Sequence, residues 1–146
     1  MLDRTNGGFL ITKIKQIQGR VFEKMLAESG ISEFNGAQGR ILFVLWERDS
    51  IPITELSEKT GLAKTTLTSM LDRLERSGHI VRAFDAADRR AVRIKLTERA
   101  QGLREKYEEV SAKMNRIFYK DFSEEEIIDF EKNLEKILNN LTEKER

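Results

Sequence analysis

A nine-residue run, Asp85–Arg93, carries the most distinctive chemistry of the chain; its sequence is Asp-Ala-Ala-Asp-Arg-Arg-Ala-Val-Arg. Three of these residues are arginines, Arg89, Arg90 and Arg93, and the small residues between them are typical of a turn. Guanidinium groups on a protruding turn can bind phosphate, or enter a minor groove where narrow A/T-rich tracts concentrate negative potential. A charged turn is also common as a plain solvated loop, so its meaning depends on the elements that position it.

The charge of the chain is unevenly distributed, although its net value is only +1. Between Lys59 and Lys95 there are nine Lys and Arg residues and four acidic residues, giving +5. Between Lys120 and Arg146 there are five basic and nine acidic residues, giving −4. A basic middle and an acidic end are expected when one surface meets phosphate and another does not.

The composition excludes several classes of protein. The chain has 146 residues, of which 35% are charged, with one proline and no cysteine; this favours well-solvated helices and excludes disulfides, thiolate zinc sites and thiol redox sensing. The N-terminus does not resemble a signal peptide, and no apolar run approaches the ~18 residues that a membrane span requires. We therefore expect a soluble, cytoplasmic protein of one modest domain or a small domain with an oligomerisation appendage, without a cofactor.

Two helical segments lead into the arginine-rich turn. A short helix is predicted around Ile53 to Thr60, then a turn at Gly61, then a longer helix around Lys64 to Ser77 that stops at Gly78. The inward face of the longer helix is apolar (Leu67, Met70, Leu71 and Leu74), and most of its hydroxyl-bearing and charged residues point elsewhere. Two short strands are predicted next, Ile80 to Phe84 and Ala91 to Leu96. Helix, turn, helix and basic hairpin is the order that a protein needs to grip both grooves of a DNA duplex.

Helices are predicted on both sides of this middle region. A helical stripe of apolar residues runs from Leu10 to Met25, and a largely apolar helix covers about Ala37 to Glu47 before a break at Arg48–Pro52. Thr97 is expected to open a helix with a stripe from Leu103 to Ile117, and Ser123 to open a last helix with a capping box and a stripe from Ile127 to Leu141. These stripes fit either a single intramolecular bundle or a dimerisation module built from both termini. We favour the dimerisation module, since little other core is available to cover the stripes.

At this point the chain resembles a known family over essentially its whole length. The segments that carry the resemblance are Leu67–Gly78, Ile80–Arg82, Asp85–Arg90 with its Asp-x-Arg order, and Ile94–Glu98 with its Leu-Thr-Glu helix start. Together they are similar to the MarR (multiple antibiotic resistance regulator) family of winged-helix transcription factors. A helix-turn-helix alone is a weak signal, whereas these segments in this order are specific.

The resemblance implies a mainly α fold: a winged helix-turn-helix DNA-binding domain over residues 35–97, with helices of residues 1–34 and 98–146 forming the dimerisation module. It also implies a homodimer on a pseudopalindromic operator in double-stranded DNA, with recognition helices roughly 34 Å apart. By analogy, Asp88 braces Arg90 in the minor groove, and Arg73 contacts phosphate. The major-groove candidates are Lys64, Thr65, Thr66, Thr68 and Ser69; the wing candidates are Asp88, Arg89, Arg90 and Arg93.

Two positions depart from the family pattern. Ala63 stands directly before the recognition helix, where relatives often have a capping residue, and an uncapped helix typically loses roughly 1 kcal/mol. Ala86 stands in the wing where proline is usual, so a more mobile wing is expected before binding.

Other signals are weaker. His79, the only histidine, is expected to have a packing or solvated role, and the acids Glu124 to Glu126 to favour the positive helix end rather than bind a metal. Catalysis is not expected, because no hydroxyl nucleophile has a plausible histidine partner and no phosphate-binding glycine loop is present. Five aromatic residues could line a cavity for the small aromatic effectors that family members bind, but core packing is favoured for each one: Phe22, Trp46, Tyr107, Phe118 and Tyr119.

The sequence therefore predicts a dimeric DNA-binding transcriptional regulator, a repressor rather than an activator, with a small aromatic effector as a further expectation. The alternative from another class is a helical scaffold protein whose basic hairpin binds an acidic protein. A winged domain that binds RNA is a further alternative among nucleic-acid-binding proteins.

Overall fold

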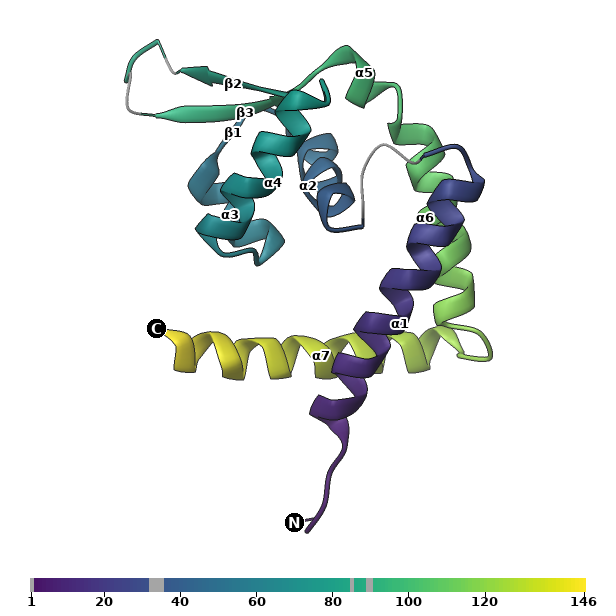
Figure 1. Ribbon diagram of the computed structural model, residues 1–146. Helices are drawn as coiled ribbons and strands as arrows, with labels where there is room; N and C mark the ends of the chain where they lie inside the picture. The colour runs from purple at the N-terminus through teal and green to yellow at the C-terminus, as the bar shows by residue number, and fades with distance from the viewer. Residues whose placement is uncertain (1, 32–35, 85, 89–90) are drawn as a thin grey trace. The chain divides into compact units, whose positions relative to one another are not determined.

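The computed structural model describes residues 2–31, 36–84, 86–88 and 91–146, and their secondary structure is mainly helical (Figure 1). Contacts divide the chain into two compact units, Met1–Ser111 and Ala112–Arg146, with the boundary inside one helix. In chain order the elements are α1 (Gly7–Glu28), α2 (Gly36–Glu47), β1 (Ile51–Pro52), α3 (Ile53–Thr60), α4 (Lys64–Arg76), β2 (Ile80–Phe84), β3 (Val92–Leu96), α5 (Glu98–Gln101), α6 (Arg104–Phe118) and α7 (Glu124–Glu145).

The core of the first unit forms where α2, α3, α4 and the sheet meet. Their apolar side chains recur at helical spacing in the helices and at alternate positions in the strands, so each element buries one face. The end of α1 and the first turns of α6 close the core through Leu26, Tyr107 and Val110. Its remaining fully buried members include Ile41, Leu42, Leu45, Leu56, Leu67, Leu71, Leu74, Ile80 and Ile94.

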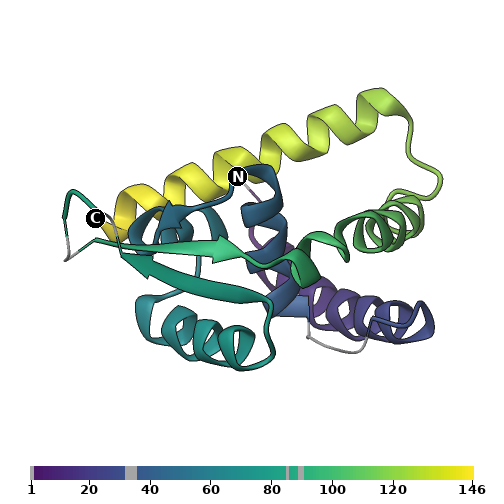
Figure 2. The same cartoon turned by 90° about the horizontal axis from the view of Figure 1, so that it is seen from above.

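The sheet has three antiparallel strands in the order β1-β3-β2, and Figure 2 shows β2 and β3 side by side along the hairpin. Ile80 pairs with Leu96 and Phe84 with Val92, so the predicted hairpin is confirmed with its second strand starting one residue later than expected. β1 was not predicted, because two residues cannot display an alternating pattern. It begins after Ser50, whose φ of 56° reverses the chain, and its Pro52 lies on a sheet edge, where a missing N–H is tolerated.

The predicted helix-turn-helix is confirmed: α3 has the predicted bounds, and α4 ends at Arg76, one residue earlier than predicted. α3 ends at Thr60, and Gly61 adopts a φ of 73°, a left-handed conformation that glycine reaches without a steric penalty. The Ser57 hydroxyl donates a 2.8 Å hydrogen bond to the Leu62 carbonyl, which fixes the turn before α4.

The predicted helix after Thr97 is interrupted. Thr97 caps α5 by accepting a hydrogen bond from the Ala100 N–H, but α5 ends at Gln101 and α6 begins at Arg104. The apolar spacing continues through this break, so periodicity did not indicate it. The α5 end is fixed instead from α2, where Trp46 Nε1 donates to the Ala100 carbonyl at 3.1 Å.

The second unit contains α7 and the end of α6. Ser123 accepts a hydrogen bond from the Glu126 N–H at 3.1 Å, and Glu126 accepts one from the Ser123 N–H at 3.0 Å, which is the predicted capping box. Hydrogen bonding by Ser123, first of all from its backbone N–H to the carboxylate, lowers the pKa of Glu126. A cluster of aromatic rings, Phe118, Tyr119, Phe122 and Phe130, packs at the corner between the two helices.

Candidate nucleic-acid interface

The helix α4 presents two faces of opposite character. Leu67, Leu71 and Leu74 are buried in the core, and this fixes the helix against the rest of the first unit. All six polar residues that the sequence assigned to DNA on this helix are exposed: Lys64, Thr65, Thr66, Thr68, Ser69 and Arg73. The structure therefore brings these six candidates together on the outside of one anchored helix.

The N-terminal end of α4 lacks a side-chain cap, as the sequence predicted. Ala63 has the extended conformation of an N-cap residue (φ −63°, ψ 149°), but its methyl group cannot accept a hydrogen bond. The first-turn residues Lys64, Thr65 and Thr66 include no acid. The partial positive charge of the helix end is therefore not offset by a side chain of the first turn, and an incoming phosphate would be attracted there.

Arg82 of β2 links the hairpin to the other end of α4, a connection that the sequence analysis missed. Its guanidinium donates from Nη2 to Asp72 Oδ1 and from Nη1 to Glu75 Oε1, both at 2.8 Å. Its backbone N–H also donates to Glu75 Oε2 at 3.3 Å. The sequence gives one signal for this connection. Ile80, Arg82 and Phe84 occupy alternate positions of β2, so Arg82 shares the side of the strand on which Ile80 is buried.

The wing is described in part. Asp88 is exposed, and its carbonyl accepts a hydrogen bond from the Ala91 N–H at 3.0 Å. Arg89 and Arg90 lie outside the described residues, so the proposed brace between Asp88 and Arg90 stays a prediction. Arg93 is half-buried, and its Nη1 donates to the Ser50 carbonyl at 2.7 Å. That bond ties β3 to the turn before β1, a structural role beside the predicted one in DNA binding.

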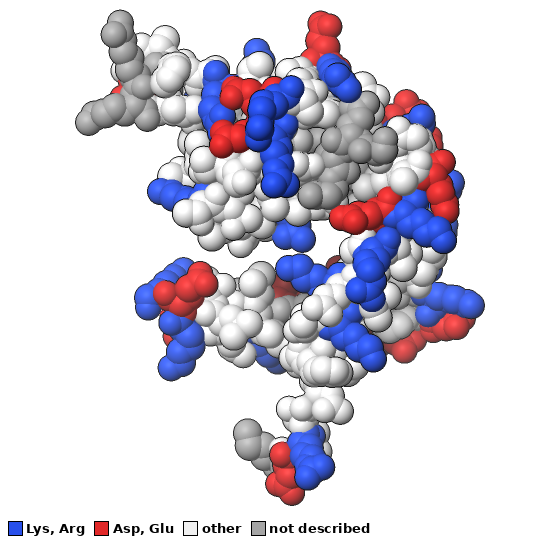
Figure 3. Space-filling view, viewed as in Figure 1, with Lys and Arg blue, Asp and Glu red and all other residues white. Residues whose placement is uncertain are grey.

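Positive and negative side chains are interleaved over the sheet and α4, as Figure 3 shows, and this face does not form a patch of one sign. The acids that interrupt the positive charge include Asp72 and Glu75, both paired with Arg82. Arg82 therefore offsets one of these two negative charges next to α4.

The aromatic residues proposed for an effector cavity fall into two groups. In the first unit, Tyr107 packs edge-on against Phe22 with ring centroids 5.6 Å apart and against Trp46 at 5.1 Å. Burial raises the pKa of Tyr107 to about 12. Phe118 and Tyr119 belong to the cluster of the second unit, where partial burial and the hydrogen bond and charge of Glu131 raise the pKa of Tyr119 to about 12. Trp46 and Tyr107 belong to the buried core and Phe22 packs against it, as expected, whereas Phe118 and Tyr119 are half-buried and lie outside that core.

The remaining candidate sites are structural. His79 is fully buried, with Nδ1 2.6 Å from the Ser77 hydroxyl, which agrees with a packing role. Among the described residues, no group of three potential metal ligands lies together. Within the same residues, no helix has both the length and the apolar character that crossing a membrane demands.

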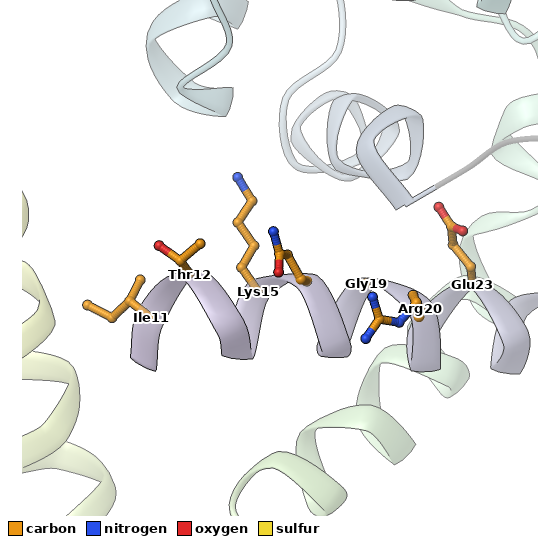
Figure 4. Close-up of a pocket in the computed structure, with 7 residues that line it drawn as sticks. Ile11, Thr12, Lys15, Gly19, Arg20 and Glu23 are labelled. Carbon is orange, nitrogen blue, oxygen red and sulfur yellow. The ribbon is translucent and has the colours of Figure 1, made fainter. Parts of the chain in front are cut away.

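A shallow hollow lies along α1, but a single helix provides its whole lining. Figure 4 shows the labelled residues spread along the helix rather than converging on an enclosed space. The lining residues are Ile11, Thr12, Lys15, Gln16, Gly19, Arg20 and Glu23. A ligand would lack contacts on its other sides there, so this hollow is not a binding site by itself.

A helix-turn-helix with an anchored, polar-faced second helix and a following antiparallel hairpin defines the winged helix-turn-helix class. The model of the MarR family matches residues 34–92, across the helix-turn-helix and most of the hairpin. The HTH-type transcriptional regulator YsmB of Bacillus subtilis (strain 168) is 34% identical over 100 residues, covering 68% of each chain. The chain thus belongs to the MarR family of helix-turn-helix transcriptional regulators.

Two further relatives place the chain within this class. It is 40% identical over 88 residues to the HTH-type transcriptional regulator TtmR of Methylorubrum extorquens (strain PA1), and the match covers 60% of this chain but only 44% of TtmR. A crystal structure of a cysteine-to-serine mutant of MarR from E. coli, complexed with operator DNA, is 26% identical with a TM-score of 0.81. It covers 94% of this chain and 99% of that chain, so the resemblance of fold includes the helices outside the winged domain.

Proposed function

We propose that this chain is a sequence-specific DNA-binding repressor that binds a pseudopalindromic operator as a homodimer. The observation that carries the proposal is the outer face of α4, where Lys64, Thr65, Thr68 and their neighbours are exposed while Leu67, Leu71 and Leu74 anchor the helix. Hydroxyl and cationic side chains on an anchored helix can reach base edges and phosphates in a major groove. The E. coli MarR mutant with operator DNA supports the proposal through its shared fold.

On the operator, α4 lies in the major groove and the hairpin reaches the minor groove. Thr65, Thr66, Thr68 and Ser69 are proposed to contact base edges, with Lys64 and Arg73 on or near phosphates. Asp88, Arg89, Arg90 and Arg93 form the proposed wing contacts, with Arg90 as the minor-groove probe. Of these, Arg93 also serves the fold through its bond to Ser50.

The proposed dimer is supported by apolar side chains that the single chain leaves exposed. On α1 these are Leu10, Ile14 and Ile17, and on α7 they include Leu138 and Leu141, which are 62% and 65% exposed. Such stripes at helical spacing are typical of helices that pack on other helices. We propose residues 35–97 as the DNA-binding domain, with residues 1–34 and 98–146 as the dimerisation module.

We further propose that this chain is not an enzyme, that it acts in the cytoplasm on chromosomal DNA, and that it responds to a small aromatic effector. The effector rests on the family alone, because the five aromatic residues considered for a cavity pack against neighbouring rings. We place no effector residue within the chain.

Selection from a random duplex library, followed by titration of the enriched duplex, tests the proposal. We expect enrichment of a pseudopalindrome whose affinity falls steeply with salt, because phosphate contacts release counterions. Arg90→Ala should weaken binding about tenfold or more while the dimer persists, since a specific contact is worth roughly 1–3 kcal/mol. Arg116→Ala, an exposed arginine of α6, is the control.

Thr68→Ala and Ser69→Ala address base recognition separately. Each should change the enriched motif at one position per half-site while non-specific affinity stays the same. If the same motif returns, these side chains do not read bases. If the chain enriches no duplex but captures an acidic protein, the scaffold alternative replaces the proposal, and preference for an RNA duplex in competition would favour the RNA alternative.

A further inference from the structure

Asp72 lies on the face of α4 that is proposed to meet DNA, in the C-terminal half of the helix. It follows Thr65 by seven residues and Thr68 by four, spacings that place residues on the same side of an α-helix. Asp72 is exposed, and so is Glu75, one turn further on. Two carboxylates at this place would repel phosphate, because a duplex on this face would approach to within about one Debye length, roughly 8–10 Å.

A single side chain engages both carboxylates. Arg82 contributes two N–H donors of one guanidinium, each 2.8 Å from a different acid, Asp72 and Glu75. The Arg82 side chain is only 24% exposed, whereas those of Asp72 and Glu75 are 52% and 41% exposed. The arginine therefore lies beneath the acids and draws them toward β2.

We propose that Arg82 is a positioning residue for DNA recognition: it holds Asp72 and Glu75 against β2 and offsets their charge, so that phosphate meets a cationic helix face. The helix alone carries three basic residues and two acids, a charge of +1, and Arg82 raises this to +2. The inference rests on the proposed DNA-binding function, and it assigns Arg82 to the acids rather than to the duplex.

An exposed ion pair contributes little to folding stability, since water screens the charges and ordering the side chains opposes pairing. Loss of Arg82 should therefore act mainly on DNA affinity. Lysine is a poor replacement, because a single ammonium lacks the planar fork with which arginine reaches two carboxylates.

The test is a mutant cycle on the duplex enriched by the wild-type chain, with titrations at several salt concentrations. Arg82→Gln should lower affinity about tenfold. Adding Asp72→Asn and Glu75→Gln to that variant should restore affinity to within about threefold of the wild type, because the repelling charges are gone. The affinity of Arg82→Lys should lie between those of Arg82→Gln and the wild type. Arg116→Gln, which removes one positive charge from α6, should have little effect.

Two results would overturn the inference. The first is wild-type affinity in Arg82→Gln. The second is a loss of affinity in Arg82→Gln that persists when Asp72 and Glu75 are neutralised, together with a salt dependence of affinity whose slope falls by about one. This result would show that Arg82 itself contacts phosphate. If Arg82→Gln unfolds at a much lower temperature than the wild type, the double variant Asp72→Asn with Glu75→Gln, which keeps Arg82, is tested in its place. An affinity equal to or above that of the wild type supports the inference, and a weaker affinity contradicts it. If the wild type enriches no duplex, the proposed function fails as well.

Discussion

The helices α4 and α7 are both amphipathic, yet they place their apolar sides in opposite environments. In α4, Leu67, Leu71 and Leu74 are buried within the first unit. In α7, whose residues 124–145 are all described, no side chain is buried. Their N-terminal ends also differ, because Ser123 and Glu126 form a capping box on α7, while Ala63 leaves α4 without a side-chain cap.

The difference indicates which side of each helix is available for an interaction. The apolar side of α4 already stabilises the fold, so its polar side is the one that can meet another molecule. Toward its C-terminal end the apolar side of α7 is exposed in the single chain, at Ile137, Leu138 and Leu141. Burying it against a second chain would be favourable at roughly 25 cal/mol per Å². The comparison therefore predicts different consequences for the same kind of substitution in the two helices.

The largest expected effect comes from placing charge on the apolar side of α7. Leu138→Glu with Leu141→Glu should dissociate the proposed dimer, since buried carboxylates would be unpaired. Operator affinity should then fall by about 100-fold or more, because the two half-sites are no longer bound by one linked molecule. Sedimentation velocity and duplex titration measure the two quantities.

Asn139→Glu with Asn140→Glu is the matched control for that variant. It adds the same two negative charges to the other side of α7, so the dimer and the affinity should persist. If both variants dissociate, net charge rather than the apolar stripe is responsible. If neither does, α7 is not part of the dimer interface.

A smaller effect, on stability, is expected at the contact between α2 and α6 that closes the core of the first unit. A Cβ atom on Gly39 of α2 would lie 2.8 Å from both Cε2 and the hydroxyl oxygen of Tyr107, and that ring is held by Phe22 and Trp46. Gly39→Ala should therefore destabilise the first unit by about 1–3 kcal/mol, the usual range for overpacking. Chemical denaturation measures the change.

Gly19→Ala in α1 is the control for Gly39→Ala. Nothing lies within 4 Å of a Cβ atom at Gly19, so alanine should raise stability by up to about 1 kcal/mol through its helix propensity. An equal loss in both variants would mean that the close approach of Tyr107 does not explain the first.

Features that depend on local sequence were predictable. Thr97 and Ser123 were recognised as helix starts, and Gly61 as the turn of the helix-turn-helix, because capping and left-handed turns require particular residue types. The exposed face of α4 was equally predictable, since the spacing of Leu67, Leu71 and Leu74 determines which residues point outward.

Features that depend on contacts between distant segments were not predictable in this way. The paired carboxylates of Asp72 and Glu75 depend on where β2 places Arg82, and the bond of Arg93 to Ser50 depends on a turn 43 residues away. Arg93 was a candidate for the wing and Arg82 had no assigned role, because a charged residue in the sequence does not show which group in the fold it meets. The resemblance to a family supplied roles for the wing but none for Arg82.

The smallest expected effect concerns the two helix starts. Ala63→Ser should stabilise the first unit by about 1 kcal/mol, because the backbone already has the N-cap conformation and only the acceptor is missing. Ser123→Ala should destabilise α7 by a similar amount. The cap of α7 should also depend on pH, because the Glu126 carboxylate accepts from the Ser123 backbone N–H, a bond that Ser123→Ala keeps and Glu126→Gln weakens. The pKa of Glu126 is lowered in the fold, so the contribution of its carboxylate is present above its usual value of 4.5 and is lost as the pH falls through the lower folded pKa. Helical circular dichroism during denaturation at pH 7 and pH 3 measures both. A loss of stability from Glu126→Gln that is equal at the two pH values would show that the charge of the Glu126 carboxylate adds nothing to the cap. A loss from Ala63→Ser would show that the free N–H groups at the start of α4 are already satisfied within the fold, which would weaken the case that this end attracts phosphate.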